Sequence, residues 1–274
     1  MKRVALALGA GGARGLAHVA VFEALDELGV RPVAIAGSSI GALAGAIYGA
    51  GMSGREIRRF VVDLAHNRGE FWRRAMLSRA GTVGDMFNGD LMAVVQIDAE
   101  KLVAQFLRDP VPDDFSALKI PLTVVASDLY TRCAVPFDSG PLKPALAASI
   151  ALPSIMRPVV IGERVLIDGG ITNPLPFDLL RGKADIVVAV DISGQPVEDR
   201  KDVPGAIETF YAAVQIMSGA IIKEKVRHDP PDLLVTPNVG SFRALDFFQA
   251  SAILRAAEAT KADLKMRLEA LLAL

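Results

Sequence analysis

The pentapeptide Gly37-Ser38-Ser39-Ile40-Gly41 constrains the fold of this chain more than any other stretch of its sequence. An apolar run from Pro32 to Ala36 precedes it, and small residues at helical spacing, Ala42 to Ala50, follow it. A G-x-S-x-G pattern between a strand and a helix is typical of a nucleophile elbow, a sharp turn that lifts a serine out of the sheet. Only glycine tolerates the crowding at the flanking positions. We therefore interpret Ser39 as a nucleophile, with an ordinary glycine-rich turn as the alternative.

Composition narrows the classes of protein that the chain can belong to. With 274 residues, it is long enough for one large domain with a well-buried core. Its apolar content of 51% and mean hydropathy of +0.36 indicate an extensive core, an apolar surface patch, or both. A net charge of −1 gives no indication of nucleic-acid binding, and the single cysteine, Cys133, excludes an internal disulfide. Since histidines are also few, we expect no metal site and no cofactor.

Two stretches resemble membrane signals. Met1-Lys2-Arg3 followed by Val4 to Ala10 has the order of charges in a signal peptide, but its apolar part is very short. The charge-free stretch from Pro32 to Gly54 carries glycine at every fourth position, as membrane helices that dimerise do. Its proline and its many glycines argue against one continuous helix, and we interpret it as a buried strand and helix. We expect a cytoplasmic protein in which peripheral membrane contact fits better than insertion.

Short runs of Val, Ile and Leu alternate with helical patterns along most of the chain. This alternation predicts an α/β fold, with a mostly parallel central sheet between two layers of helices. No linker or repeat divides the sequence, so we predict a single domain over 1–274, with the motifs in about 4–191 and C-terminal helices in about 204–272. The predicted strands are Val4–Leu8, Val33–Ala36, Leu122–Ala126, Val159–Ile161, Val165–Ile167, Ile186–Val190 and Leu233–Val235. The predicted helices are Gly15–Leu28, Ser39–Ala50, Ser53–His66, Asp98–Arg108, Lys143–Ile150, Pro204–Val226 and Asp246–Leu272.

Two local patterns refine this assignment. Ser53 followed by Glu56 forms a capping box that fixes the start of the third helix. The segment from Arg68 to Leu91 fits neither a helical nor a strand period and mixes aromatic residues with arginines. It is either a mobile cap or an excursion that packs on the core.

A glycine-rich loop, Gly9 to Gly15, follows the first predicted strand. Its backbone N–H groups at a helix N-terminus suit either a nucleotide phosphate or the oxyanion of an acyl transfer. The dinucleotide fingerprint G-x-G-x-x-G fails because Arg14 occupies the third glycine position. With an elbow serine one strand–helix unit later, we favour an oxyanion hole formed by the N–H groups of Gly11, Gly12 and Ile40.

Arg14 itself is unusual in the first turn of a helix, where a cation opposes the helix dipole. We therefore expect an anionic partner for it. A buried carboxylate is favoured over a phosphorylated substrate.

A nucleophilic serine needs a base. Asp168 in Ile167-Asp168-Gly169-Gly170 follows an apolar strand, and we expect it at the carboxyl edge of a parallel sheet, where sites collect. An apolar setting would have to raise its pKa for it to act as a base. A Ser-Asp-His order with His228 last is the alternative. His228 lies in a polar stretch that we interpret as a solvated loop, and we interpret His18 as a packed or capping residue.

Together these motifs resemble the patatin-like phospholipase family, over about Val4 to Asp191. The family pattern joins a Gly-Gly-Gly-x-Arg/Lys-Gly loop, a G-x-S-x-G elbow and a later Asp-Gly-Gly/Ala. The resemblance implies a Ser39–Asp168 dyad that works without histidine on acyl esters of lipids, as in short, single-domain bacterial members. The supporting motif positions are Arg14, Gly15, Gly37, Gly41, Gly169 and Gly170.

One departure from the family pattern is Ala10, which replaces the first glycine of the loop. It would be strained if that position required a positive φ. We predict a serine acyl hydrolase of the phospholipase A, lysophospholipase or esterase type. The alternatives are an acyltransferase that uses the same site and a non-hydrolytic regulator that binds a lipid or a protein. The oligomeric state stays open.

Overall fold

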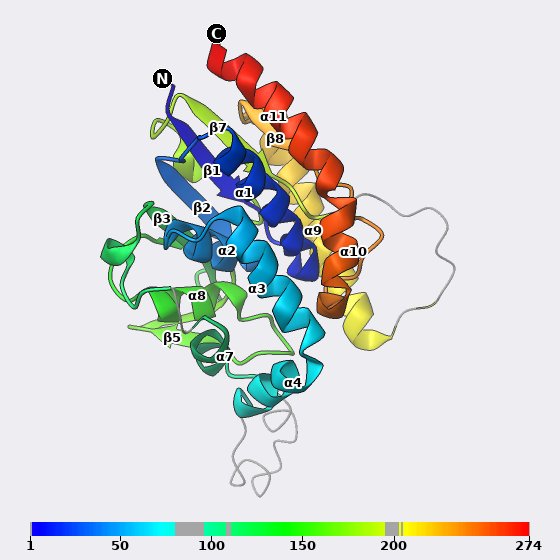
Figure 1. Ribbon diagram of the computed structural model, residues 1–274. Coiled ribbons are helices and arrows are strands. Elements are labelled where there is room, and N and C mark those ends of the chain that lie inside the picture. The colour runs from blue at the N-terminus through cyan, green and yellow to red at the C-terminus, as the bar shows by residue number, and fades with distance from the viewer. Residues whose placement is uncertain (1, 80–95, 108–110, 195–202, 204, 274) are drawn as a thin grey trace, which may run out of the picture.

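The computed structural model describes residues 2–79, 96–107, 111–194, 203 and 205–273 (Figure 1). Its centre is an eight-stranded sheet in the order β5-β6-β3-β2-β1-β7-β8, with β4 paired to β3. Five neighbouring strands, β3, β2, β1, β7 and β8, run parallel to one another. Strands β4 and β6 pair antiparallel with β3, and β5 pairs antiparallel with β6. The strands are β1 (Val4–Leu8), β2 (Ala34–Ser38), β3 (Leu122–Asp128), β4 (Ala134–Phe137), β5 (Val159–Ile161), β6 (Arg164–Asp168), β7 (Ile186–Val190) and β8 (Leu233–Val235).

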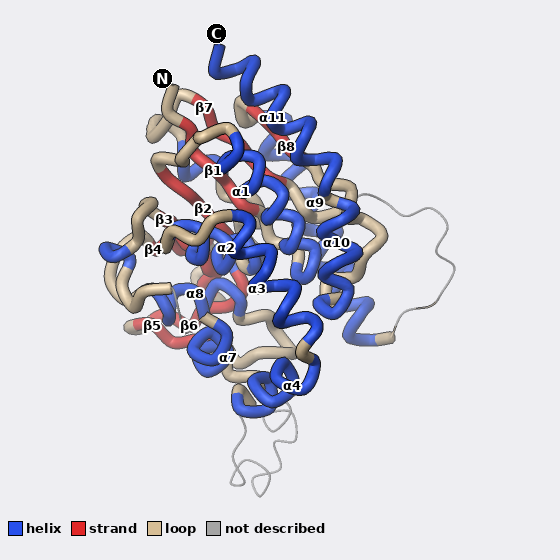
Figure 2. The backbone as a smooth tube through the Cα atoms, viewed as in Figure 1, coloured by secondary structure: helices blue, strands red, loops and turns tan. Residues whose placement is uncertain are grey.

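Helices lie on both sides of this sheet (Figures 1 and 2), which confirms the predicted three-layer fold. The α-helices are α1 (His18–Glu27), α2 (Ile40–Gly49), α3 (Gly54–His66), α4 (Arg68–Leu77), α7 (Ala99–Phe106), α8 (Leu142–Ile150), α9 (Ala206–His228), α10 (Ala250–Ala256) and α11 (Glu258–Ala273). The 3-10 helices are η1 (Gly12–Ala17), η2 (Phe115–Ala117), η3 (Gly169–Ile171), η4 (Phe177–Leu180) and η5 (Phe247–Gln249).

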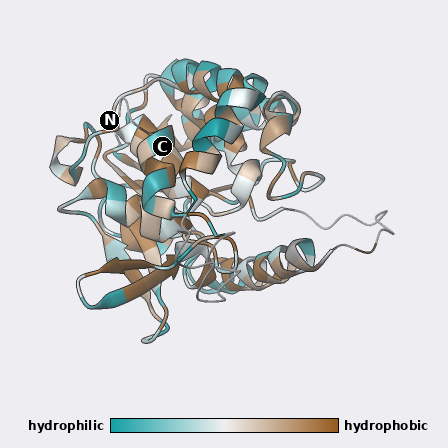
Figure 3. Cartoon of the chain, turned by 90° about the horizontal axis from the view of Figure 1, so that it is seen from below, coloured by the Kyte–Doolittle hydropathy of each residue, from teal (hydrophilic) through white to brown (hydrophobic). Residues whose placement is uncertain are grey.

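The two faces of the sheet carry side chains of different size. On β1, Val4, Leu6 and Leu8 face the larger core beneath α1, α2, α8 and α11. The alternate positions, Ala5 and Ala7, face a smaller core closed by η4 and Ile222 of α9. Since successive strand residues point to opposite faces, this alternation fixes which helices cover which side. Figure 3 shows the strands coloured mostly hydrophobic, whereas the outer helices mix both colours.

Most predicted elements are present, and the differences are local. The capping box of α3 is confirmed, with Ser53 and Glu56 bonded reciprocally. The predicted helix Asp246–Leu272 is divided into η5, α10 and α11, and β4 was not predicted. Of the segment from Arg68 to Leu91, residues 68–77 form a helix, and residues 80–91 lie outside the described residues.

The stretch from Pro32 to Gly54 contains β2, the elbow and α2 rather than one helix. Within the described ranges, no helix is both long and apolar enough to cross a membrane.

Candidate active site

Ser39 occupies the sharp turn between β2 and α2. Its backbone angles, φ 54° and ψ −125°, lie in a region that a residue with a side chain rarely adopts. A Cβ on Gly37 would come 2.6 Å from the Gly41 carbonyl, and one on Gly41 would overlap the Leu8 carbonyl. The strained serine between obligatory glycines is the geometry of a nucleophile elbow.

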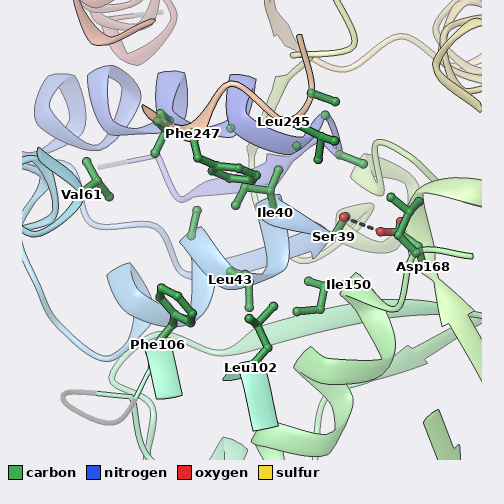
Figure 4. A pocket seen from close by; sticks show the side chains of 18 of the residues that line it. Ser39, Ile40, Leu43, Val61, Leu102, Phe106, Ile150, Asp168, Leu245 and Phe247 are labelled. Atoms are coloured by element: carbon green, nitrogen blue, oxygen red, sulfur yellow. Dashed lines mark hydrogen bonds between the residues drawn. The ribbon is translucent and has the colours of Figure 1, made fainter. Parts of the chain in front are cut away.

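Ser39 and Asp168 meet across the top of the sheet (Figure 4). The Ser39 hydroxyl donates a hydrogen bond of 2.6 Å to Oδ2 of Asp168, and the Gly170 amide donates one of 2.7 Å to Oδ1. Asp168 ends β6, which runs antiparallel to β3 and pairs Asp168 with Ala126. An antiparallel strand of the mostly parallel sheet therefore carries this carboxylate, and its register places Asp168 near the carboxyl end of β3.

The environment of Asp168 favours its protonated form. The residue is only 5% exposed, and burial raises the pKa of its carboxyl to about 6, against the opposing hydrogen bonds from Ser39 and Gly170. A carboxylate with a pKa near 6 is a better proton acceptor than one of ordinary pKa and is still ionised at neutral pH. The side chain thus has the properties of a general base.

Two further serines hold the backbone of this pair. The Ser39 amide donates to the Ser149 hydroxyl at 2.9 Å, and that hydroxyl donates to the Val125 carbonyl at 2.6 Å. The Ser127 hydroxyl donates to the Asp168 carbonyl at 2.8 Å. Our site prediction did not include these residues, although the stretches that contain them, Ala126 to Leu129 and Ala148-Ser149, resemble the family.

The glycine-rich loop lies beside the elbow. Gly12 has a φ of +61°, and a Cβ there would contact the Ala244 backbone. Gly12 and Ile40 are the first residues of η1 and α2, so their amides have no acceptor within their own helices. Both residues and Gly11 line the same cavity as Ser39. Ala10 does not have a positive φ, so its substitution for glycine introduces no such strain.

The remaining glycines of the motifs allow close contacts. A Cβ on Gly15 would overlap the Ile40 side chain, and one on Gly169 would overlap the Val125 carbonyl. A Cβ on Gly170 would come 2.8 Å from that of Ala10. These positions bring the glycine-rich loop, the elbow and the loop after Asp168 together.

Arg14 belongs to the loop itself and is 4% exposed. Its Nη1 donates to the Ser193 carbonyl. Burial lowers the pKa of its guanidinium, and the charge of Asp191 opposes that shift. The direct partner is thus a backbone carbonyl rather than the expected carboxylate.

Among the described residues, neither His18 nor His228 forms a hydrogen bond with Ser39 or Asp168. His18 is fully buried with its Nε2 3.0 Å from the Gly9 carbonyl, and burial lowers its pKa to about 4. His228 ends α9 rather than lying in a loop, and its Nδ1 is 3.1 Å from the Glu224 carbonyl. It does not line the cavity that holds Ser39.

A cavity of about 540 Å³ extends from the dyad between α2, α3, α4 and α7. Figure 4 shows Ser39 and Asp168 at one end, with Leu102, Phe106 and Val61 further along. Its lining is almost entirely apolar, which suits a hydrocarbon chain. Residues beyond 193 also line the cavity, including Tyr211, Leu245 and Phe248. The C-terminal region thus forms part of the site, although its sequence contains none of the motifs.

The fold and the site define an α/β protein with a serine nucleophile elbow and a facing aspartate. The chain belongs to the patatin-like phospholipase family, whose family model matches residues 6–181.

Known proteins extend this likeness. An NTE family protein of Mycobacterium tuberculosis is 39% identical over 202 residues, which cover 73% of this chain and 52% of that protein. Patatin-like phospholipase domain-containing protein 7 of Rattus norvegicus is 26% identical, over 89% of this chain and 19% of its own length. The chain thus spans about half the length of its mycobacterial relative. The crystal structure of VipD from Legionella pneumophila shares the fold, with a TM-score of 0.52 and 16% identity over 96% of this chain and 66% of that one.

Proposed function

We propose that this chain is a serine hydrolase of lipid carboxylic esters. The observation that carries the proposal is the 2.6 Å hydrogen bond between Ser39 and Asp168 at one end of an apolar cavity. A nucleophile with a proton acceptor in reach, next to space for a hydrocarbon chain, supports acyl transfer from a lipid.

The reaction follows from the roles of these groups. Asp168 accepts the hydroxyl proton as the Ser39 oxygen attacks the ester carbonyl. The N–H groups of Gly11, Gly12 and Ile40 stabilise the oxyanion. The alcohol leaves with the proton from Asp168, and an acyl-enzyme remains on Ser39. Asp168 then takes a proton from water as the hydroxide attacks the acyl carbonyl. The Ser39 oxygen leaves with that proton from Asp168, and the fatty acid is released. No step uses a metal or a cofactor.

Replacement of either member of the dyad tests the proposal. We expect Ser39→Ala and Asp168→Asn each to lower kcat for p-nitrophenyl acyl esters by on the order of 10³ or more, because a dyad acts as a unit. His228→Ala should retain activity and serves as the matched control for a histidine-dependent scheme. A fluorophosphonate probe should label the wild-type protein but not Ser39→Ala. An unreactive Ser39 would favour the non-hydrolytic regulator, and acyl transfer to added glycerol would favour the acyltransferase.

A further inference from the structure

The outer face of α4 exposes large apolar side chains. Trp72, Met76 and Leu77 are 58%, 61% and 53% exposed. Their spacing places them on one side of the helix, because residues four apart share a face. The helix also contacts α7, since the Phe71 ring, which is half-buried, lies 5.4 Å from that of Phe106.

The same helix concentrates positive charge. Residues 68–79 contain four arginines and one glutamate, a formal net charge of +3 in a chain whose net charge is −1. Arg73 and Arg74 both pair with Glu70 and lower the pKa of its carboxyl to about 2, so this glutamate is already neutralised by the helix itself. Arg68 lies over the Phe248 ring, 5.1 Å from its centroid. The surface thus combines aromatic, aliphatic and cationic groups.

This face adjoins the point where the cavity meets solvent. Among the described residues that line the cavity, only Trp72 and Leu245 are exposed. The Trp72 and Phe248 rings lie 6.1 Å apart, which joins α4 to the segment that follows Leu245. In Figure 1, α4 lies at the end of the molecule opposite the two termini.

We propose that this region binds the surface of an anionic lipid bilayer. Aromatic and aliphatic side chains enter the boundary between headgroups and acyl chains, and cations beside them are attracted to anionic lipids. The inference rests on the proposed function, because the bound surface would supply the lipid ester directly to the cavity mouth. The binding itself does not require catalysis. The docking face consists of Arg68, Trp72, Arg73, Met76, Leu77 and Leu245.

Trp72 is the only tryptophan of the chain and therefore reports on this face without a label. The Ser39→Ala protein, which cannot consume the lipid, is mixed with vesicles of phosphatidylcholine containing phosphatidylglycerol. We expect its emission to shift to shorter wavelength and the protein to sediment with these vesicles. Binding should be far weaker with pure phosphatidylcholine, and in ~1 M salt, where the Debye length falls to about 3 Å.

Variants of the docking face locate the contact. We expect the double variant Met76→Ser/Leu77→Ser to lose the emission shift, and Arg73→Gln to bind about fivefold more weakly. Met266→Ser removes an equally exposed methionine, 65% exposed on α11, and should bind like the parent protein. Thermal unfolding of each variant confirms that it folds.

Unchanged vesicle binding in the double variant, or equal binding to neutral vesicles, would overturn the proposal. So would a wild-type dimer that the double variant dissociates, because the face would then be a contact between copies. Fluorophosphonate labelling of Ser39 separates the two proposals: if labelling persists while vesicle binding fails, the docking face alone is rejected. Vesicle binding without labelling would reject the hydrolase.

Discussion

The two ends of the cavity are built by opposite means. At the dyad end, polar groups are fixed by short hydrogen bonds and by glycines that allow backbones to touch. At the α4 end, the Phe71 ring contacts those of Phe106 and Phe248 edge to face, and Trp72 is exposed. The dyad end tolerates little displacement because its bonds are directional, whereas apolar contacts adapt to different ligands. Mutations at the α4 end can therefore change which ligands fit the cavity without moving Ser39 and Asp168.

The largest expected effect concerns the stability cost of the dyad end. The folded pKa of Asp168 is raised from 3.8 to about 6. The protonated form of Asp168 is therefore favoured in the folded state. Its contribution to the free energy of unfolding, about 3 kcal/mol, is fully present below the unfolded pKa and is lost as pH rises through about 6. Asp168→Asn removes this titration, so its stability relative to the wild type should increase between pH 4 and pH ~7.5.

Urea unfolding of both proteins at the two pH values measures this change. A difference between the proteins that does not vary with pH would contradict it. The same titration predicts that kcat/KM of the wild type falls about tenfold per pH unit below about 6, because only the carboxylate accepts a proton.

The next effect tests how the elbow is supported. Ser149→Ala removes the acceptor of the Ser39 amide and the donor to the Val125 carbonyl. Because a buried unpaired group costs about 1–3 kcal/mol, we expect a loss of stability of ~2 kcal/mol and at least a severalfold lower kcat. Ser116→Ala, an exposed serine that bonds Asp114, is the matched control and should change stability by less than about 0.5 kcal/mol. Wild-type stability and activity in Ser149→Ala would show that the elbow is rigid without this bond.

The smallest effect concerns the apolar end. Phe106→Ala removes part of the wall distant from Ser39, and the lost contact area corresponds to about 1–2 kcal/mol. We expect KM for long-chain esters to rise about tenfold and KM for acetyl esters to stay the same. Phe137→Ala, which removes a partly buried ring outside the cavity, should affect neither. An equal rise for both chain lengths would show that Phe106 holds the whole site rather than the chain.

The dyad end has compact signals in the sequence because its motifs are local. Gly37 to Gly41 specify a strained turn within five positions, and Gly11 and Gly12 begin a helix directly after a strand. The antiparallel direction of β6 is not a property of its own residues, so the sequence did not predict it. The apolar end has no compact signature, because Val61, Leu102 and Phe248 come from three distant segments whose periodicity resembles that of any core.

The unequal faces of the central sheet have a consequence for how this protein can diversify. Ala5, Ala7, Ala34 and Ala36 already carry nearly the smallest side chains, so most mutations at these four positions add bulk that η4 and α9 must absorb. The opposite face offers leucines, valines and phenylalanines that can be trimmed or enlarged stepwise. If the proposed function holds, mutations that change the preferred acyl chain should therefore arise on the side of the larger core. The alanine-lined side should change little.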